Sequence, residues 1–153
     1  MEVFIFDTET TWLFNKKEKD LNKQPYIIQF SWILVDMNND WTFKEISRID
    51  ELIKPPISIP YYTSKIHWIY EIDIKEKKNF EYFAETIMKY INDSDIIVWH
   101  NISFDENLLK TEIARLKLKW KLIDYCPKRV ICTMNESIEF LSLIHISEPT
   151  RPY

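Results

Sequence analysis

The feature that most constrains this chain is an apolar run near its start that ends in two acidic residues. Val3 to Phe6 is a short β-branched and aromatic segment, which predicts a buried central strand. Asp7 and Glu9 follow it, separated by one residue. Because residues two apart on an extended backbone point to the same face, we expect these two carboxylates to converge. Neighbouring carboxylates repel each other unless a cation lies between them, and hard oxygen ligands suit Mg²⁺ or Mn²⁺.

A second apolar strand, predicted at residues 95–99, is followed by His100, Asn101 and then Asp105. The spacing places Asp105 in the first turn of a predicted helix, which we expect Ser103 to cap. A bare Asp-x-Glu pair is most often a strand end with solvated acids. The second strand strengthens the prediction of a shared site because it delivers a third carboxylate.

These two motifs together resemble the first two motifs of the DEDD 3′→5′ exonucleases. The first is Phe-Asp-Thr-Glu-Thr-Thr at residues 6–11, and the second is His-Asn-x-x-Phe-Asp at residues 100–105. The family includes the DnaQ-like proofreading subunits of bacterial DNA polymerase III (the epsilon type) and has a ribonuclease H-like fold. The resemblance runs from Met1 to about Ser137, and it implies hydrolysis of phosphodiester bonds at the 3′ end of single-stranded DNA.

The resemblance also implies a role for each site residue. Asp7 would bridge two Mg²⁺ or Mn²⁺ ions and Glu9 would hold the ion that activates water. Asp105 would serve the second ion, which stabilises the leaving 3′-oxygen. The expected contacts to the terminal nucleotide come from the two motifs and their neighbours: Thr8, Thr10, Leu13, His100, Asn101 and Phe104.

Structural roles stay open for several of these residues. His100 and Asn101 could equally shape the turn into the helix. For Phe104 we favour a core position over a base-stacking one. His67 belongs to a predicted short helix at residues 61–67, and there we favour a packing or capping role.

The family's third motif, a His or Tyr general base followed by a fourth carboxylate, is missing from this sequence. His145 has no aspartate after it, and Asp124–Tyr125 has neither the order nor the helical setting. Loss of a general base alone costs about 10²–10⁴-fold in rate, so we expect an essentially inactive fragment. The segment at residues 132–134, Cys-Thr-Met, weakly favours relatives with a His base.

Residue patterning predicts one α/β domain with a mixed five-stranded sheet flanked by helices. The first three strands should form an antiparallel meander and the last two should run parallel. The resemblance implies, in addition, that the family's C-terminal helix is missing. At 153 residues the chain is long enough for a single core. The expected strands are residues 2–7, 26–36, 42–49, 95–99 and 129–133, and the expected helices are residues 61–67, 79–91 and 103–118.

The end of the sequence sets the limits of the predicted domain. The stretch from Leu141 to Arg151 resembles the in-frame translation of a transposon-end sequencing adapter. We therefore expect an incomplete exonuclease domain at residues 1–140 and a tail at residues 141–153 that is not native.

Composition bears on compartment and partners. No apolar run reaches membrane-spanning length and no signal peptide is visible, so we expect a cytoplasmic protein with no membrane partner. Cys126 and Cys132 lack metal-ligand spacing and are expected to be reduced thiols. The net charge of −4 gives no global basic field, although a cleft charged by metal does not need one. The expected partners are a single-stranded nucleic-acid 3′ end and, in addition, a DNA polymerase.

Two other functions remain open at this stage: an exoribonuclease or oligoribonuclease of the same fold, and a catalytically silent nucleic-acid-binding module. A downstream helix with His-x-x-x-x-Asp in the unbroken gene would favour the enzyme, and a true stop codon would favour the binding module. The sequence leaves open DNA or RNA as substrate, a bacterial or phage origin, polymerase association and oligomeric state.

Tryptophan and glycine are distributed unusually. Glycine is absent, and there are six tryptophans. Five of them stand where local physics or the family pattern asks for glycine. This pattern suggests UGA codons translated as tryptophan in a source that reads UGA as glycine, with a Trp-rich, AT-biased protein as the alternative. The five positions are Trp12, Trp41, Trp68, Trp99 and Trp120.

Overall fold

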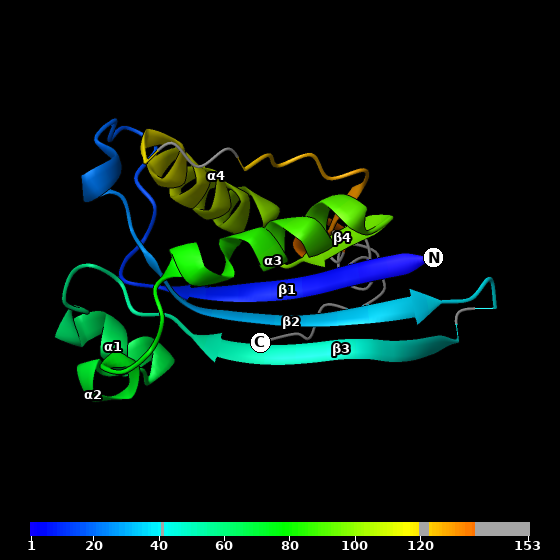
Figure 1. Cartoon of the computed structure of the whole chain (residues 1–153), viewed down its shortest axis with the longest axis horizontal. Helices are drawn as coiled ribbons and strands as arrows, with labels where there is room; N and C mark the ends of the chain where they lie inside the picture. Colours follow the sequence, from blue (N-terminus) through cyan, green and yellow to red (C-terminus); the bar gives the residue numbers. More distant parts are fainter. Residues whose placement is uncertain (41, 120–122, 137–153) are drawn as a thin grey trace, which may run out of the picture.

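The computed structural model describes residues 1–40, 42–119 and 123–136. The predicted tail, Trp41 and Trp120 lie outside the described residues, and so does His145. The molecule is built on a five-stranded sheet in the order β3-β2-β1-β4-β5, with β1 at its centre (Figure 1).

The sheet has the predicted mixed topology. β1 (Glu2–Thr10), β2 (Ile27–Met37) and β3 (Phe43–Leu52) form an antiparallel meander. β4 (Ile96–Trp99) pairs parallel with β1, and β5 (Val130–Cys132) pairs parallel with β4. The predicted meander followed by parallel strands is therefore confirmed.

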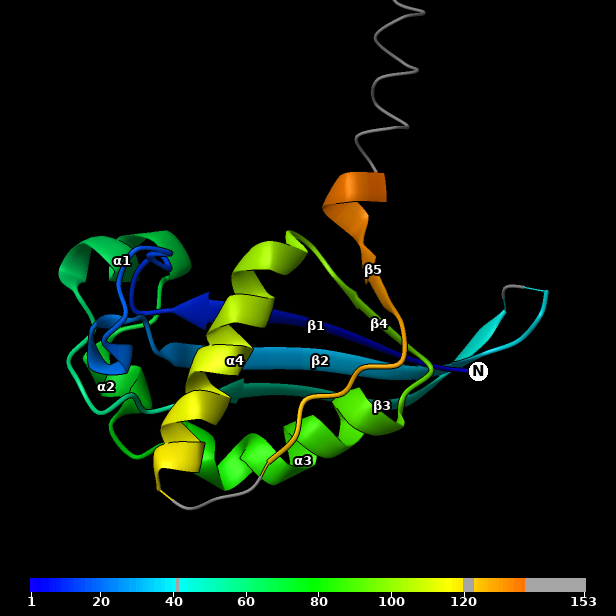
Figure 2. The ribbon, with the colours of Figure 1, turned by 90° about the horizontal axis from the view of Figure 1, so that it is seen from above.

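Two long helices cover one face of the sheet. α3 (Phe80–Asp93) and α4 (Ile102–Leu118) both lie there, and α4 crosses the strands (Figures 1 and 2). Two short helices, α1 (Tyr61–His67) and α2 (Glu71–Ile74), lie at the end of the sheet toward which β1 runs. The β2–β3 hairpin and the N-terminus lie at the opposite end. The prediction missed α2 and a single 3-10 turn at Leu21–Lys23, both too short to show a hydrophobic period.

The main core fills the space between the sheet and the two long helices. Phe6 of β1 stacks on Phe30 of β2 at 5.0 Å between ring centroids and contacts Trp99 of β4 at 4.7 Å. The apolar side of α4 packs onto these rings, as its spacing predicts. The residues of α4 in this core are Leu108, Leu109, Ile113 and Leu116.

Two local predictions at the site were wrong. β1 extends to Thr10 rather than ending at Asp7, so Glu9 also lies within the strand, because β2 pairs with β1 along its whole length. Ser103 does not cap α4. The helix begins at Ile102, and Asn101 occupies the capping position with a left-handed backbone (φ 60°) and no capping hydrogen bond from its side chain. Asparagine tolerates this conformation better than most residues.

Of the three described tryptophans that are candidates for recoded glycine, one has a backbone conformation that favours glycine. Trp68, with φ 62°, and Asn101 are the two residues with positive φ in the part of the chain that the structure describes. Trp68 follows α1 in the left-handed conformation that glycine usually provides at a helix end. Trp12 has no such backbone, and Trp99 is buried in the core.

Cys126 is exposed and Cys132 is buried, and neither forms a disulfide, which agrees with the predicted reduced thiols. Within the described ranges, no helix is both long and apolar enough to cross a membrane.

Candidate active site

The first site element is the carboxyl-terminal half of β1. Strand alternation turns Phe6 and Thr8 toward the helices, and both are buried, whereas Asp7 and Glu9 point to the other face. Asp7 is exposed and Glu9 is half-buried. The structure thus brings the first two predicted ligands to one face of one strand.

The second element is the first turn of α4, which carries Asp105. Asp105 is only 4% exposed, and the hydroxyl group of Thr8 donates a hydrogen bond to its Oδ1 atom. Because Thr8 lies on the opposite face of β1 from Asp7 and Glu9, Asp105 meets the strand from the helix side. The Thr8 side chain is therefore used to hold a predicted metal ligand.

The three carboxyl groups influence one another electrostatically. Burial raises the pKa of Asp105 to about 6, the Thr8 hydrogen bond opposes this rise, and the negative charges of Asp7 and Glu9 add to it. Burial, followed by the charge of Asp7, also raises the pKa of Glu9. These shifts have the sign expected when like charges are held close together away from water.

In the described part of the chain, no three His, Cys, Asp or Glu side chains are close enough to hold one metal ion. The structure places Asp105 within electrostatic reach of Asp7 and Glu9, without gathering the three into such a group. The chemistry of the donors nevertheless fits a hard divalent cation, because all are carboxylate oxygens and a cation would relieve the desolvation and mutual repulsion that raise their pKa values.

The remaining second-motif residues shape the turn between β4 and α4. His100 is exposed, and its Nδ1 atom lies 3.1 Å from the Thr133 hydroxyl group just after β5. Asn101 provides the left-handed turn. Phe104 is partly buried against the main core, which agrees with the preference for a core position. The contact of His100 with Thr133 joins the ends of the neighbouring strands β4 and β5, and no local sequence pattern predicts it.

The residues after β1 have mixed settings. The Thr10 hydroxyl group donates to the Trp12 carbonyl oxygen at 2.9 Å, which shapes the turn. Leu13 is 80% exposed and contributes no packing to the core. His67 ends α1, and its Nδ1 atom accepts from the Ile69 amide at 3.1 Å, so it caps the turn as predicted. Burial lowers the pKa of His67.

The fold belongs to the ribonuclease H-like class, and the comparisons with known proteins place the chain in a nuclease family. Residues 4–144 match the exonuclease family model. The chain belongs to this family, in its DnaQ-like DEDD branch.

The curated relatives are DNA polymerase III epsilon subunits. The chain is 32% identical over 117 residues to the epsilon subunit of Buchnera aphidicola (subspecies Schizaphis graminum), which covers 76% of this chain and 47% of that protein. It is 37% identical over 65 residues to the epsilon subunit of Rickettsia prowazekii, covering 42% of this chain and 28% of that protein. The chain therefore spans about half or less of these relatives.

Two solved structures share the fold at low sequence identity. Exonuclease X in complex with a 5′-overhanging duplex DNA has a TM-score of 0.56 at 21% identity, covering 98% of this chain and 76% of that chain. Exonuclease I of E. coli in complex with an oligonucleotide has a TM-score of 0.68 at 14% identity, covering 99% of this chain and 32% of that chain. These similarities establish the ribonuclease H-like fold.

Proposed function

We propose that this exonuclease domain removes nucleotides from the 3′ end of single-stranded DNA, with Asp7, Glu9 and Asp105 as its metal-binding carboxylates. The observation that carries the proposal is the position of Asp105. It is buried in the first turn of α4, yet it is within electrostatic reach of the two carboxylates of β1. A buried acid near two like charges is a typical functional-site arrangement.

Asp7, Glu9 and Asp105 would hold Mg²⁺ or Mn²⁺. Such ions, when bound, supply an activated water and charge stabilisation at the leaving 3′-oxygen. The protein's own contribution is positional: Thr8 orients Asp105 through its hydroxyl group, and the β1–β2 ladder fixes the spacing of Asp7 and Glu9. His100 and Asn101 would support the turn that presents Asp105.

We further propose that a general base and a fourth carboxylate follow Phe140 in the unbroken gene. Neither is present in the sequence up to that residue in a setting that fits the family's third motif. A missing base costs about 10²–10⁴-fold, so the 153-residue chain should hydrolyse DNA slowly at best. The relatives are named as polymerase III subunits, so we also propose a DNA polymerase as partner.

The test is a trimming assay with the longer chain encoded by the unbroken gene. A 5′-labelled single-stranded oligonucleotide should shorten from its 3′ end in Mg²⁺ or Mn²⁺ and stay intact in EDTA. Asp7→Ala should abolish trimming, and Glu85→Ala, an exposed acid on α3, should have no effect. Full activity of Asp7→Ala would refute the proposed site. A matched RNA oligonucleotide trimmed faster than the DNA would instead favour an exoribonuclease.

A further inference from the structure

We propose that one surface of α1, formed by Tyr61, Tyr62 and Lys65, stacks on the bases of the single strand that leads into the site. We call this the α1 aromatic surface. The proposal rests on the proposed function and adds the path that the strand takes outside the carboxylate site.

The two tyrosines are unusually exposed. Tyr61 is 69% and Tyr62 is 63% exposed, although the next two residues, Thr63 and Ser64, are buried against the body of the protein. Lys65 lies over the Tyr61 ring, with its Nζ atom 4.7 Å from the centroid. Exposed aromatic faces next to a cation are the combination used by proteins that bind single strands without sequence preference.

The residues on either side of α1 anchor it to the body of the protein. Ile59, just before α1, and Ile69, just after it, belong to a buried apolar cluster with Ile28 of β2 and Ile74 of α2. The Thr63 hydroxyl group donates to the Pro60 carbonyl oxygen at 2.8 Å at the start of α1. A rigid aromatic side chain loses little conformational entropy when a base stacks on it, so the exposed rings can contribute directly to affinity.

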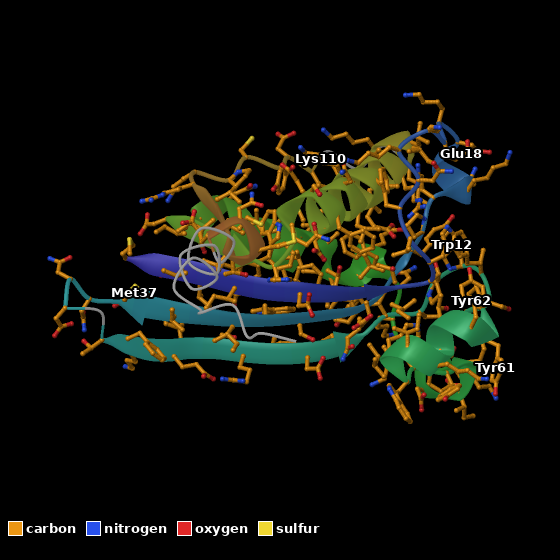
Figure 3. The ribbon with its side chains drawn as sticks, turned by 180° about the vertical axis from the view of Figure 1, so that it is seen from behind. Trp12, Glu18, Met37, Tyr61, Tyr62 and Lys110 are labelled. Carbon is orange, nitrogen blue, oxygen red and sulfur yellow. The ribbon has the colours of Figure 1, made fainter. Side chains whose placement is uncertain are left out.

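The α1 aromatic surface lies beside the end of β1 that carries Asp7 and Glu9. α1 is next to the tip of β1 in both Figure 1 and Figure 2. Figure 3 shows Tyr62 on the side of α1 toward Trp12, which follows β1, and Tyr61 farther out. A strand whose 3′ end reaches the carboxylates can therefore continue over α1.

The local charge suits a phosphate backbone. Between residues 54 and 78 there are five lysines and three acidic residues, in a chain whose net charge is −4. Two of those acids already accept backbone hydrogen bonds, Glu71 from Ile59 and Asp73 from Tyr70. The segment that contains α1 and α2 thus carries more lysines than acids, although the chain as a whole is acidic, and this local excess favours contact with a phosphate backbone.

We do not include Trp68 in the α1 aromatic surface, although its side chain is 77% exposed. Its left-handed backbone marks a position suited to glycine. The proposal therefore depends only on side chains with ordinary helical backbones.

The test is an anisotropy titration of the 153-residue chain with labelled oligothymidylate in EDTA, which prevents hydrolysis. The oligonucleotide has about ten nucleotides, within the site sizes of single-strand binders. Tyr61→Ala and Tyr62→Ala should each weaken binding by about 5- to 100-fold, the usual effect of losing one stacked base. Tyr61→Phe and Tyr62→Phe should bind like the parent. The control is Phe43→Ala, 64% exposed at the hairpin end of β3, which should change nothing.

A second readout locates the contact. Photocrosslinking with bromodeoxyuridine-substituted oligonucleotide, mapped by mass spectrometry, should label Tyr61 or Tyr62. Parent-like binding by both alanine variants, or labelling elsewhere only, would overturn the α1 surface while trimming by the longer chain leaves the exonuclease proposal intact. No binding by the parent, together with no trimming by the longer chain, would overturn both. If the alanine variants lose self-association in sedimentation but keep DNA affinity, the surface contacts a second copy and the proposal is wrong.

Discussion

The guanidinium carbon of Arg115 lies 3.6 Å from the centroid of the Tyr26 ring, which joins α4 to the segment entering β2. Arg115 also pairs with the buried Glu112 at 2.9 Å, and Glu112 in turn accepts from the Ile27 amide at 3.3 Å. The remaining N–H groups of Arg115 donate to backbone carbonyl oxygens of Leu21, Gln24 and Pro25. One arginine therefore fixes the loop after the first motif to the helix that carries Asp105.

Arg115→Met should reduce the free energy of unfolding by about 3–5 kcal/mol, because it leaves the Glu112 charge buried without its partner. Urea denaturation followed by circular dichroism measures the loss. The matched control is Arg48→Met, which breaks an exposed i,i+3 pair with Glu45 and should cost about 1 kcal/mol or less. Equal losses of unfolding free energy in the two variants would show that Arg115 does not fix the loop to α4.

Asp105 should make metal-free protein less stable as the pH rises. Its pKa is raised to about 6 in the folded protein, from an ordinary value near about 4. The folded state therefore binds the proton more tightly, and the stability this gives is present below about pH 4 and lost as the pH rises through about 6. In EDTA, Asp105→Asn should flatten this decline and stabilise the protein at neutral pH.

Metal provides the complementary measurement for Asp105. Adding Mn²⁺ at neutral pH should raise the melting temperature of the parent protein and not that of Asp105→Asn, because a ligand that binds only the folded state stabilises it. An equal rise in both proteins would show that Asp105 does not hold the ion.

Thr8→Val should raise the pKa of Asp105 further, because the hydroxyl donor that favours the charged form is removed. Thr8→Ser keeps the donor and should restore the parent value. Carboxyl ¹³C NMR titration reports the pKa directly. An unchanged titration in Thr8→Val would mean that the hydrogen bond does not act on Asp105 in solution.

Trp68→Gly should stabilise the protein by about 1 kcal/mol, because a left-handed backbone costs about 1–2 kcal/mol for residues with a Cβ atom. The side chain is exposed, so little packing is lost with it. Trp68→Ala is the control, since it removes the indole but keeps Cβ, and it should show no such gain. Trp99→Gly should instead destabilise the core. Reading the codons at both positions gives an independent check, with UGG at Trp68 ending the recoding hypothesis there.

Most of the sheet could be predicted because its strands have strong local signals. The aromatic and β-branched runs before Asp7 and before His100 predicted β1 and β4, and the apolar spacing from Leu108 to Leu116 predicted the buried side of α4. The Asn101 turn was missed because asparagine and serine are about equally good helix caps, so the residue types alone do not decide between Asn101 and Ser103 as the start of α4.

The contacts that organise the site were beyond local reasoning. Thr8 and Asp105 are 97 residues apart in sequence, and Arg115 and Leu21 are 94 apart. Periodicity can place each residue on one face of its own helix or strand. A hydrogen bond between α4 and β1, however, depends on how the helix crosses the strand. For the same reason, the two carboxylates of β1 could be paired from the sequence, whereas the distance from them to Asp105 could not.

β1 pairs over different lengths with its two neighbouring strands, which leaves main-chain groups near the carboxylates that side-chain substitution cannot test. β2 pairs with β1 from Glu2 to Thr10, but β4 pairs with it only from Val3 to Ile5. Within the described residues, the peptide groups between Asp7 and Glu9 are therefore paired with β2 on one side and with no strand on the other. An alanine scan deletes side chains and leaves every one of these peptide groups in place. Amide-to-ester replacement in a semisynthetic chain is the substitution that would register what the main chain itself contributes beside the carboxylates.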